Sequence, residues 1–403
     1  MAQTDVLITE SGYENILIGL LKELGYEYTH GSEVPRSSPL YQDVYITEDF
    51  LTTVGRINAE LPRVAIETAL TQLQDLSGGS VVDLNMTFTT YIQDGVPVRY
   101  FVDDEEVYNR VQLLDYHNAK NNFFRVVNQY TFQERETKRP DVILFVNGMP
   151  LVLFELKSPT RDNTDTSEAY AQRYLKVIPS IFVPNAFCVL TDLADTRVGS
   201  ITAPEDRFMV WKTKDGKTED SGCGRIGTMI RGMCAKERLL DLVKNFICFD
   251  SRQKGKAKII AGYHQYYAVK KAIERALVAV GSNADVPESQ RKKIGVFWHT
   301  QGSGKSLSMV FFAHAIIEKL KTSTIVVITD RNQLDDQLFG QFAACKEFLH
   351  QEPVQARNKR HLLELLNNRK VNGIIFTTMQ KFGELKDTYE KFAKDDEGAQ
   401  WDG

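Results

Sequence analysis

The sequence predicts an α/β protein with two domains, and two stretches of the 403-residue chain carry that prediction. In the first stretch, the apolar runs 142–146 and 151–154 flank Asn147-Gly148, which is the pattern of a β-hairpin. In the second, the apolar run 294–298 precedes a loop of small residues and then apolar residues at helical spacing, as expected for a strand, a turn and a helix. A chain of this length exceeds one typical core. We therefore expect a mixed-sheet domain over residues 1–245 and a second α/β domain over residues 246–403.

The composition is that of an ordinary globular protein, with 42% hydrophobic and 25% charged residues. The formal net charge of −4 excludes a protein that is basic throughout, so any nucleic-acid surface must be local. The five cysteines show no paired metal-ligand spacing, and we interpret them as reduced thiols of a cytoplasmic protein. Neither a signal peptide nor an apolar run of membrane length occurs, so no membrane partner is expected.

The elements of the first domain follow from apolar periodicity. Helical spacing after Ser11 predicts a first helix that ends at Gly25, followed by a strand over 26–31. We expect helix over 40–77 with a new segment starting at Pro62, a solvated turn at the acids 103–106, and a strand over 123–132. Beyond the hairpin we expect a helix over 167–177, a strand over 187–191, a surface loop over 200–235 and a helix over 237–249.

A basic stretch near the domain boundary has two equal interpretations. Its cations either contact phosphates or belong to a solvated linker. They are Arg252, Lys254, Lys256 and Lys258.

The hairpin carries the candidate chemistry, because Glu155 and Lys157 lie on one face of its second strand. A two-residue loop would pair 141 with 154 and send Asp141 to the opposite face. A three-residue type I turn with Gly148 in the left-handed region, followed by a bulge, would bring all three side chains together. We favour the odd-numbered loop, because two carboxylates can hold Mg²⁺ and an adjacent lysine can orient or deprotonate a water.

The run R-P-D…N-G-M-P-L…E-L-K-S-P resembles the P-D…(D/E)-x-K core of restriction-type nucleases and, closely, the motor subunit of type I restriction enzymes. The resemblance implies a restriction-endonuclease-like fold in which Asp141 and Glu155 bind the metal and Lys157 assists the water. It also implies an acid from the first helix, best matched by Glu14, and a tyrosine on the helix after the hairpin, matched by Tyr174. The family's glutamine on that helix is shifted here to Gln172, so its role is not carried over.

The loop after 294–298 has the composition of a phosphate-binding loop. Its candidate contacts are Thr300, Gly302, Ser303, Gly304, Lys305 and Ser306. Backbone N–H groups at a helix N-terminus bind phosphates, Lys305 reaches the β and γ phosphates, and the Ser306 hydroxyl is a ligand of Mg²⁺. His299 stands where the common motif has its first glycine. The loop resembles that of superfamily 2 helicases, which implies a RecA-like fold, and type I motor subunits have histidine at this place.

Three further segments fit the helicase resemblance. Gln265 matches the family's adenine-reading glutamine upstream of the loop. Arg331, Thr378 and Gln380 follow two apolar strands and match the family's contacts to the DNA backbone. No D-E-A-H-like box occurs before Gly403, so we expect a complete nuclease domain and a truncated first motor lobe, with little ATP hydrolysis.

The leading hypothesis is therefore the N-terminal part of the restriction subunit of a type I enzyme from the bacterial or archaeal cytoplasm. The family implies Mg²⁺, ATP, double-stranded DNA, and partner modification and specificity subunits that bind S-adenosylmethionine. One alternative is a repair or resection helicase–nuclease without methyltransferase partners. Another is a DNA-binding assembly module with a vestigial nuclease.

Overall fold

The computed structural model describes residues 10–156, 174–192, 195–220, 225–252, 256–280, 293–321, 324–367 and 373–382. The chain divides into two compact units. The first comprises residues 1–247 and 255–263, and the second comprises residues 248–254 and 264–403. No helix in the described ranges is both long enough and apolar enough to cross a bilayer.

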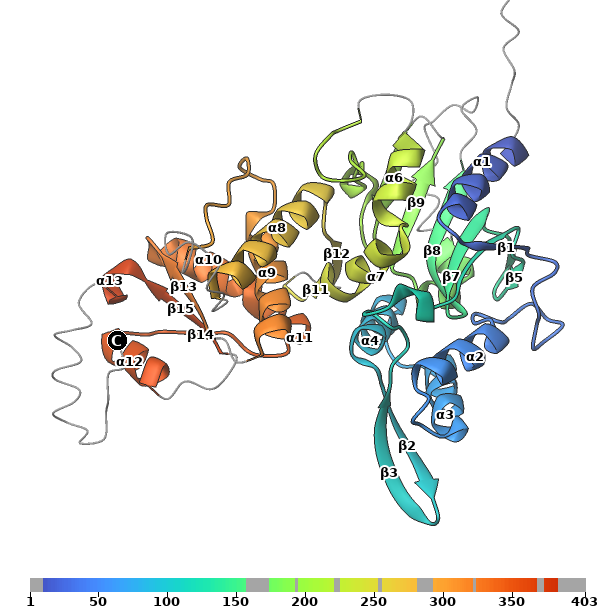
Figure 1. Cartoon of the computed structure of the whole chain (residues 1–403), viewed down its shortest axis with the longest axis horizontal. Helices are drawn as coiled ribbons and strands as arrows, with labels where there is room; N and C mark the ends of the chain where they lie inside the picture. The colour runs from blue at the N-terminus through green and yellow to red at the C-terminus, as the bar shows by residue number, and fades with distance from the viewer. Residues whose placement is uncertain are drawn as a thin grey trace, which may run out of the picture. The chain divides into compact units, whose positions relative to one another are not determined.

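A six-stranded mixed sheet forms the centre of the first unit (Figure 1). Its strands, in spatial order, are β1 (Glu27–His30), β4 (Phe124–Asn128), β7 (Val142–Val146), β8 (Met149–Leu156), β9 (Phe187–Thr191) and β10 (Thr196–Gly199). The pairs β1–β4 and β8–β9 are parallel, and the other neighbours are antiparallel. Every residue of β7 is buried, as is every residue of β8 except Glu155, so the middle of the sheet is covered on both faces.

Helices and two small ribbons surround this sheet. Helix α1 (Glu10–Glu23) packs against β1, β4 and β8. The other helices of the unit are α2 (Thr47–Ile57), α3 (Arg63–Gln74), α4 (Val81–Asp94), α6 (Arg225–Met233) and α7 (Lys236–Asn245), with short 3-10 helices at Ala119–Asn121, Pro179–Phe182 and Glu205–Arg207. The ribbons are β2 (Val96–Val102) with β3 (Glu105–Val111), and β5 (Phe132–Gln133) with β6 (Thr137–Lys138); β11 (Ile247–Asp250) and β12 (Ala257–Ile260) follow α7.

The predicted first helix and the strands at 26–31, 142–146 and 187–191 are confirmed as α1, β1, β7 and β9. The strand expected over 123–132 is shorter, since β4 ends at Asn128 and Phe132 begins β5, and the strand from 151 is confirmed as β8 as far as Leu156. The helical segment expected over 40–77 is two helices, because the chain breaks after α2 and Pro62 caps α3. The helix expected over 237–249 is shorter in the structure. It ends at Asn245 as α7, and the apolar residues that follow form strand β11. Of the helix expected at 167–177, residues 167–173 lie outside the described residues.

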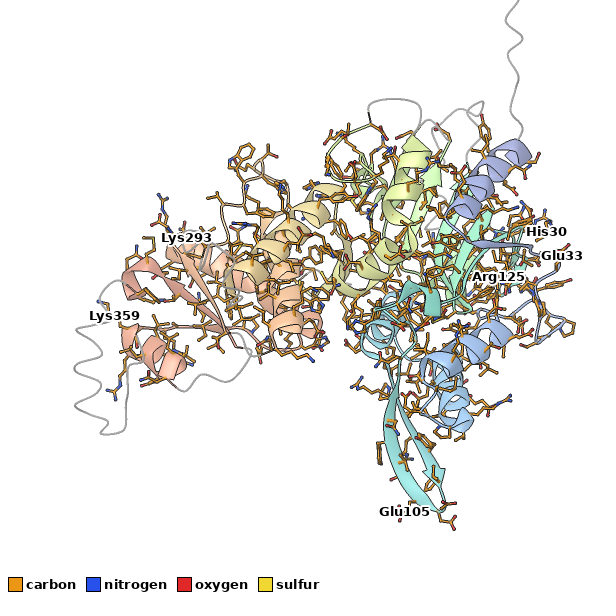
Figure 2. The ribbon with its side chains drawn as sticks, viewed as in Figure 1. His30, Glu33, Glu105, Arg125, Lys293 and Lys359 are labelled. Atoms are coloured by element: carbon orange, nitrogen blue, oxygen red, sulfur yellow. The ribbon has the colours of Figure 1, made fainter. Side chains whose placement is uncertain are left out.

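The ribbon of β2 and β3 was not anticipated, and it projects from the first unit (Figure 1). Asp103 and Asp104 form its turn with φ angles of 50° and 65°, which confirms a turn at the acid run. Glu105 begins β3 and lies at the tip of the ribbon (Figure 2).

The described cations of the basic stretch have partners within the protein. The stretch is therefore not a solvated linker, and not all of its cations are available to phosphates. Lys258 is 4% exposed, and its Nζ donates to Asn85 Oδ1 and to the Asn185 carbonyl. Lys256 pairs with Asp83 at 2.9 Å. Arg252 pairs with Asp250, and Lys254 lies outside the described residues. For Lys256 and Lys258 the sequence could not show this, because their acceptors come from α4 and from the segment before β9.

The second unit contains a three-stranded parallel sheet in the order β13 (Ile325–Thr329), β15 (Ile374–Thr378), β14 (Val354–Gln355). Its helices are α8 (Tyr263–Val280), α9 (Lys305–Leu320), α10 (Asn332–Ala344), α11 (Lys346–Leu349), α12 (Lys359–Asn367) and α13 (Met379–Phe382). The strands expected at 324–329 and 373–376 and the helix after the loop are confirmed.

Candidate functional site

The hairpin of β7 and β8 places Asp141 and Glu155 on the same face of the sheet, but not by the turn that we expected. Val146 pairs with Met149, so the loop has two residues, Asn147 and Gly148, with φ angles of 50° and 76°. The expected three-residue turn is therefore wrong. A bulge at Leu151 shifts the register by one residue, so that Val142 pairs with Phe154 and the next positions outward are 141 and 155.

Both carboxylates are half-buried and are held in place. The Leu156 backbone N–H donates to Asp141 Oδ2 at 2.6 Å, which directs this side chain toward the end of β8. The Tyr174 hydroxyl lies 3.5 Å from Glu155 Oε2, so the predicted tyrosine does meet the predicted glutamate. Lys157 and Gln172 lie outside the described residues, and the position of the candidate lysine stays a prediction.

Glu14 reaches the same end of the sheet from α1, where it is 7% exposed. Its Oε2 accepts from Asn128 Nδ2 at 2.8 Å and its Oε1 from Gln129 Nε2 at 2.6 Å. The Gln129 backbone N–H donates to the Asp141 carbonyl at 3.1 Å, so one residue connects the helix acid to the hairpin acid. Gln129 also has a φ of 54°, a conformation that is uncommon for a residue with a side chain.

Sequence reasoning missed Asn128 and Gln129. Their signal was two adjacent amides directly after an apolar strand. Buried amides at a strand end need partners, and a nearby acid is the natural one.

The donor set suits a hard divalent cation. Asp141 and Glu155 offer carboxylate oxygens from one face, and Mg²⁺ in proteins commonly takes one or two carboxylates and keeps several waters. Within the described ranges, no three His, Cys, Asp or Glu side chains group closely enough to enclose a metal ion. Two carboxylates on one face are a donor set that an open Mg²⁺ site with several bound waters can use.

In the second unit, the strand predicted at 294–298 is wrong. Residues 293–300 have no regular structure, and Val296 and Trp298 are 96% and 77% exposed. A strand needs a neighbour to take its N–H and C=O groups, and the three described strands of this sheet pair with one another instead.

The loop itself has the features of a phosphate-binding turn. Gly304, with a φ of 78°, caps α9, so the helix N-terminus opens directly onto the loop. Lys305 Nζ donates to the carbonyls of His299 and Thr300 at 2.8 and 3.0 Å, which folds the lysine back over the loop. Ser303 Oγ also donates to the Thr300 carbonyl.

The other predicted loop residues lie at this turn. Gly302 has a φ of 81°, and the half-buried Ser306 is in the first turn of α9. Burial, together with nearby His264 and Lys305, lowers the pKa of His299.

Gln265, the predicted adenine contact, supports the loop from α8. Its Nε2 donates to the Gly304 carbonyl at 3.0 Å, and the side chain is 6% exposed. A Cβ at Gly304 would lie 2.6 Å from that same nitrogen, so a side chain there would displace the glutamine amide.

The three predicted DNA contacts meet at one edge of the parallel sheet. Thr329 at the end of β13 pairs with Thr378 at the end of β15. Gln380 Nε2 donates to the Asp330 carbonyl at 3.0 Å, beside the exposed Arg331. Thr378 is 1% exposed, so only Arg331 and Gln380 present side chains at the surface.

Two family models match different regions of the chain. Residues 8–207 match the family model of the type I restriction enzyme R protein N terminus, and residues 264–398 match that of the SWI2/SNF2 ATPase. The chain is 36% identical over 391 residues to the type I restriction enzyme HindI endonuclease subunit of Haemophilus influenzae, covering 93% of this chain and 36% of that protein.

It is also 32% identical over 414 residues to the putative type I restriction enzyme MjaIXP endonuclease subunit of Methanocaldococcus jannaschii, covering 95% of this chain and 38% of the relative. The chain thus spans little more than a third of the length of these curated relatives. The matches show that it belongs to the family of type I restriction enzyme R subunits, over the region that includes the N-terminal family model.

Proposed function

We propose that the chain is the N-terminal part of the nuclease and motor subunit of a type I restriction enzyme and that its first unit cuts double-stranded DNA. The observation that carries the proposal is the register of β7 and β8, which puts Asp141 and Glu155 on one face. The six-stranded mixed sheet with α1 on it is compatible with a restriction-endonuclease-like fold, and the parallel sheet of the second unit with part of a RecA-like lobe.

Asp141 and Glu155 would hold Mg²⁺, which lowers the pKa of a bound water and stabilises charge on the phosphate. The Leu156 N–H keeps Asp141 oriented, and Tyr174 restricts Glu155. Glu14 adds negative potential from α1 at the same end of the sheet. Lys157, two residues beyond Glu155, is the proposed group that orients the attacking water.

The second unit would bind ATP at the loop 299–306, with Lys305 moving from the loop carbonyls to the phosphates and Ser306 contacting Mg²⁺. Arg331 and Gln380 would contact the DNA backbone. In the whole protein, ATP-driven movement of duplex DNA would feed the nuclease, together with modification and specificity subunits.

The test uses the full-length protein assembled with its partners and an unmodified circular duplex. Asp141→Ala should abolish cutting in Mg²⁺ and ATP while ATP hydrolysis stays within about twofold of wild type, and Lys305→Ala should abolish both. Asp103→Ala, at the ribbon turn, is the matched acidic control and should change neither. Persistent cleavage by the Asp141 variant would overturn the nuclease assignment.

A further inference from the structure

The short ribbon of β5 and β6 lies at the end of the sheet that carries the candidate metal site. It is formed by the segment that connects the end of β4 with the start of β7. The two ends of this segment are joined, because the Gln129 N–H donates to the Asp141 carbonyl at 3.1 Å. The pairing of β5 with β6 leaves residues 134–136 as the turn. The ribbon therefore leads directly into the first candidate metal ligand.

Four hydrogen bonds anchor this turn to the segment that carries the candidate tyrosine. The Arg135 N–H donates to the Val177 carbonyl at 3.0 Å, and Arg135 Nη1 donates to the Lys176 carbonyl at 2.9 Å. The Glu134 carboxylate accepts from the N–H of Ser180 at 3.0 Å and from its hydroxyl at 2.9 Å. The ribbon thus connects one candidate metal ligand with the segment whose tyrosine meets the other.

The exposed charge of the ribbon is positive. Both of its acids are engaged within the protein, Glu134 as described above and Glu136 with Lys138 at 2.7 Å. Arg135 and Arg139 are exposed. Among the described residues, no carboxylate lies within ion-pair distance of either arginine, so both keep their charge available at the surface.

Exposed cations lie beside both candidate acids. Arg139 precedes Asp141 by two residues, so their Cα atoms are at most about 7.6 Å apart. Lys176, which is exposed, belongs to the same helical turn as Tyr174, whose hydroxyl lies 3.5 Å from Glu155. In the part of the chain that the structure describes, no acid pairs with Lys176 either.

Positive charge is needed here because the candidate site is itself acidic. Glu14, Asp141 and Glu155 repel the DNA backbone unless a metal ion and nearby cations offset their charge. Each DNA strand has a phosphate about every 3.4 Å of helix axis, so the phosphates next to the one at the metal come within reach of side chains that start about 7.6 Å away. Arginine suits this contact, because its planar guanidinium binds a phosphate through two hydrogen bonds.

We propose that Arg135, Arg139 and Lys176 form a cationic rim of the candidate metal site, which binds the backbone phosphates beside the one that is cut. The inference rests on the proposed nuclease function and deepens it by naming the groups that position the duplex. Arg139 holds the strand next to Asp141, and the other two cations hold it on the side of Glu155. None of the three takes part in the chemistry.

The first measurement is the binding of a short fluorescent duplex to this chain by polarisation, with Ca²⁺ in place of Mg²⁺, over a series of salt concentrations. Arg139→Gln should weaken binding and make the slope of log K against log salt shallower by about 0.9, the value for one lost phosphate contact. Combining it with Arg135→Gln should double that change, and Arg139→Lys should restore most of the slope. The control is Arg63→Gln, an exposed arginine of α3 that pairs with Glu67, and it should leave the slope unchanged.

The second measurement separates a contact to DNA from a structural role. If Arg139 only held Asp141 in place, Arg139→Gln would weaken Mn²⁺ binding to the chain without DNA. A cation beside two carboxylates repels a metal ion, so the inference predicts that the variant binds Mn²⁺ at least as tightly as wild type.

Melting temperatures show that each variant is folded, which is expected because Arg139 is exposed. A wild-type salt slope in folded Arg139→Gln, or weaker Mn²⁺ binding by this variant, overturns the inference. Failure of the wild-type chain to bind duplex at all counts instead against the proposed function.

Discussion

Gln129 is expected to control metal binding although its side chain is an amide. It donates to Glu14 through Nε2 and to the Asp141 carbonyl through its backbone N–H. Because φ at this position is 54°, glycine accepts the backbone conformation without strain. Gln129→Gly therefore removes the side chain while the backbone contact to Asp141 is kept.

The expected size of the effect follows from the lost contact. A hydrogen bond to a charged group contributes about 1.5–3 kcal/mol, and about 1.4 kcal/mol corresponds to a factor of ten in affinity. Glu14 keeps one amide, Asn128, at 2.8 Å. Because Glu14 is not one of the two proposed ligands and acts on the metal through its charge, Gln129→Gly should weaken Mn²⁺ binding by about tenfold at most.

The assay is a titration of this chain with Mn²⁺, with free metal followed by electron paramagnetic resonance. Gln133→Gly, four residues further on, is the control and should bind like wild type. Asp141→Ala should lose binding altogether and so shows that the measured site is the intended one. If Asp141→Ala abolishes binding and Gln129→Gly binds as tightly as wild type, the connection through Gln129 has no role in metal binding.

Three other predictions concern stability and nucleotide binding. Burial lowers the pKa of Lys258 to about 7 from 10.5, so between these values the unfolded chain binds more protons and stability rises with pH. The free energy of unfolding should rise by about 1 kcal/mol from pH 7 to pH 8. Lys258→Met should remove this rise. If the urea midpoint shifts equally between the two pH values in the wild type and in the variant, the prediction is wrong. Gly148→Ala should lower the free energy of unfolding by about 2–4 kcal/mol, since φ is 76° and the new Cβ would lie 2.4 Å from the Ile46 carbonyl oxygen. The control is Gly19→Ala in α1, where a Cβ has open space, and it should not lower the melting temperature. Gln265→Ala should weaken binding of a fluorescent ATP analogue about tenfold by freeing the loop at Gly304, and an unchanged affinity would show that the loop holds its shape without it.

The sequence predicted most of the central sheet, because β4, β7, β8 and β9 are largely apolar runs bounded by turn or polar residues. The shared face of Asp141 and Glu155 was predicted from a turn that the structure does not have, and Tyr174 was expected near them only from the family resemblance. The sequence could not predict the partners of Glu14 or the burial of Lys258. Those contacts join residues that are between 73 and 173 positions apart, and no local pattern records such distances.

At residues 294–298 the local pattern predicted a strand that the structure does not contain. Four of these five residues have strong β-propensity, the exception being Gly295, yet in the described ranges no neighbouring strand pairs with them and their side chains are exposed. Propensity measures how well a side chain fits a sheet and does not supply the sheet.

The register of the hairpin was encoded in the sequence, at Pro150. Asn147-Gly148 selects a two-residue turn, and with regular pairing that turn would have put Asp141 and Glu155 on opposite faces. Proline lacks the N–H that a ladder requires, so in a strand with neighbours on both sides it marks an edge or a bulge. The structure places the extra residue directly after it, at Leu151, whose carbonyl accepts from the Ala186 N–H at 2.7 Å and so is not left unsatisfied. The turn and the proline together therefore fix which side of the sheet the two acids share, and Pro150→Val should loosen that register and lower metal affinity more than it lowers stability.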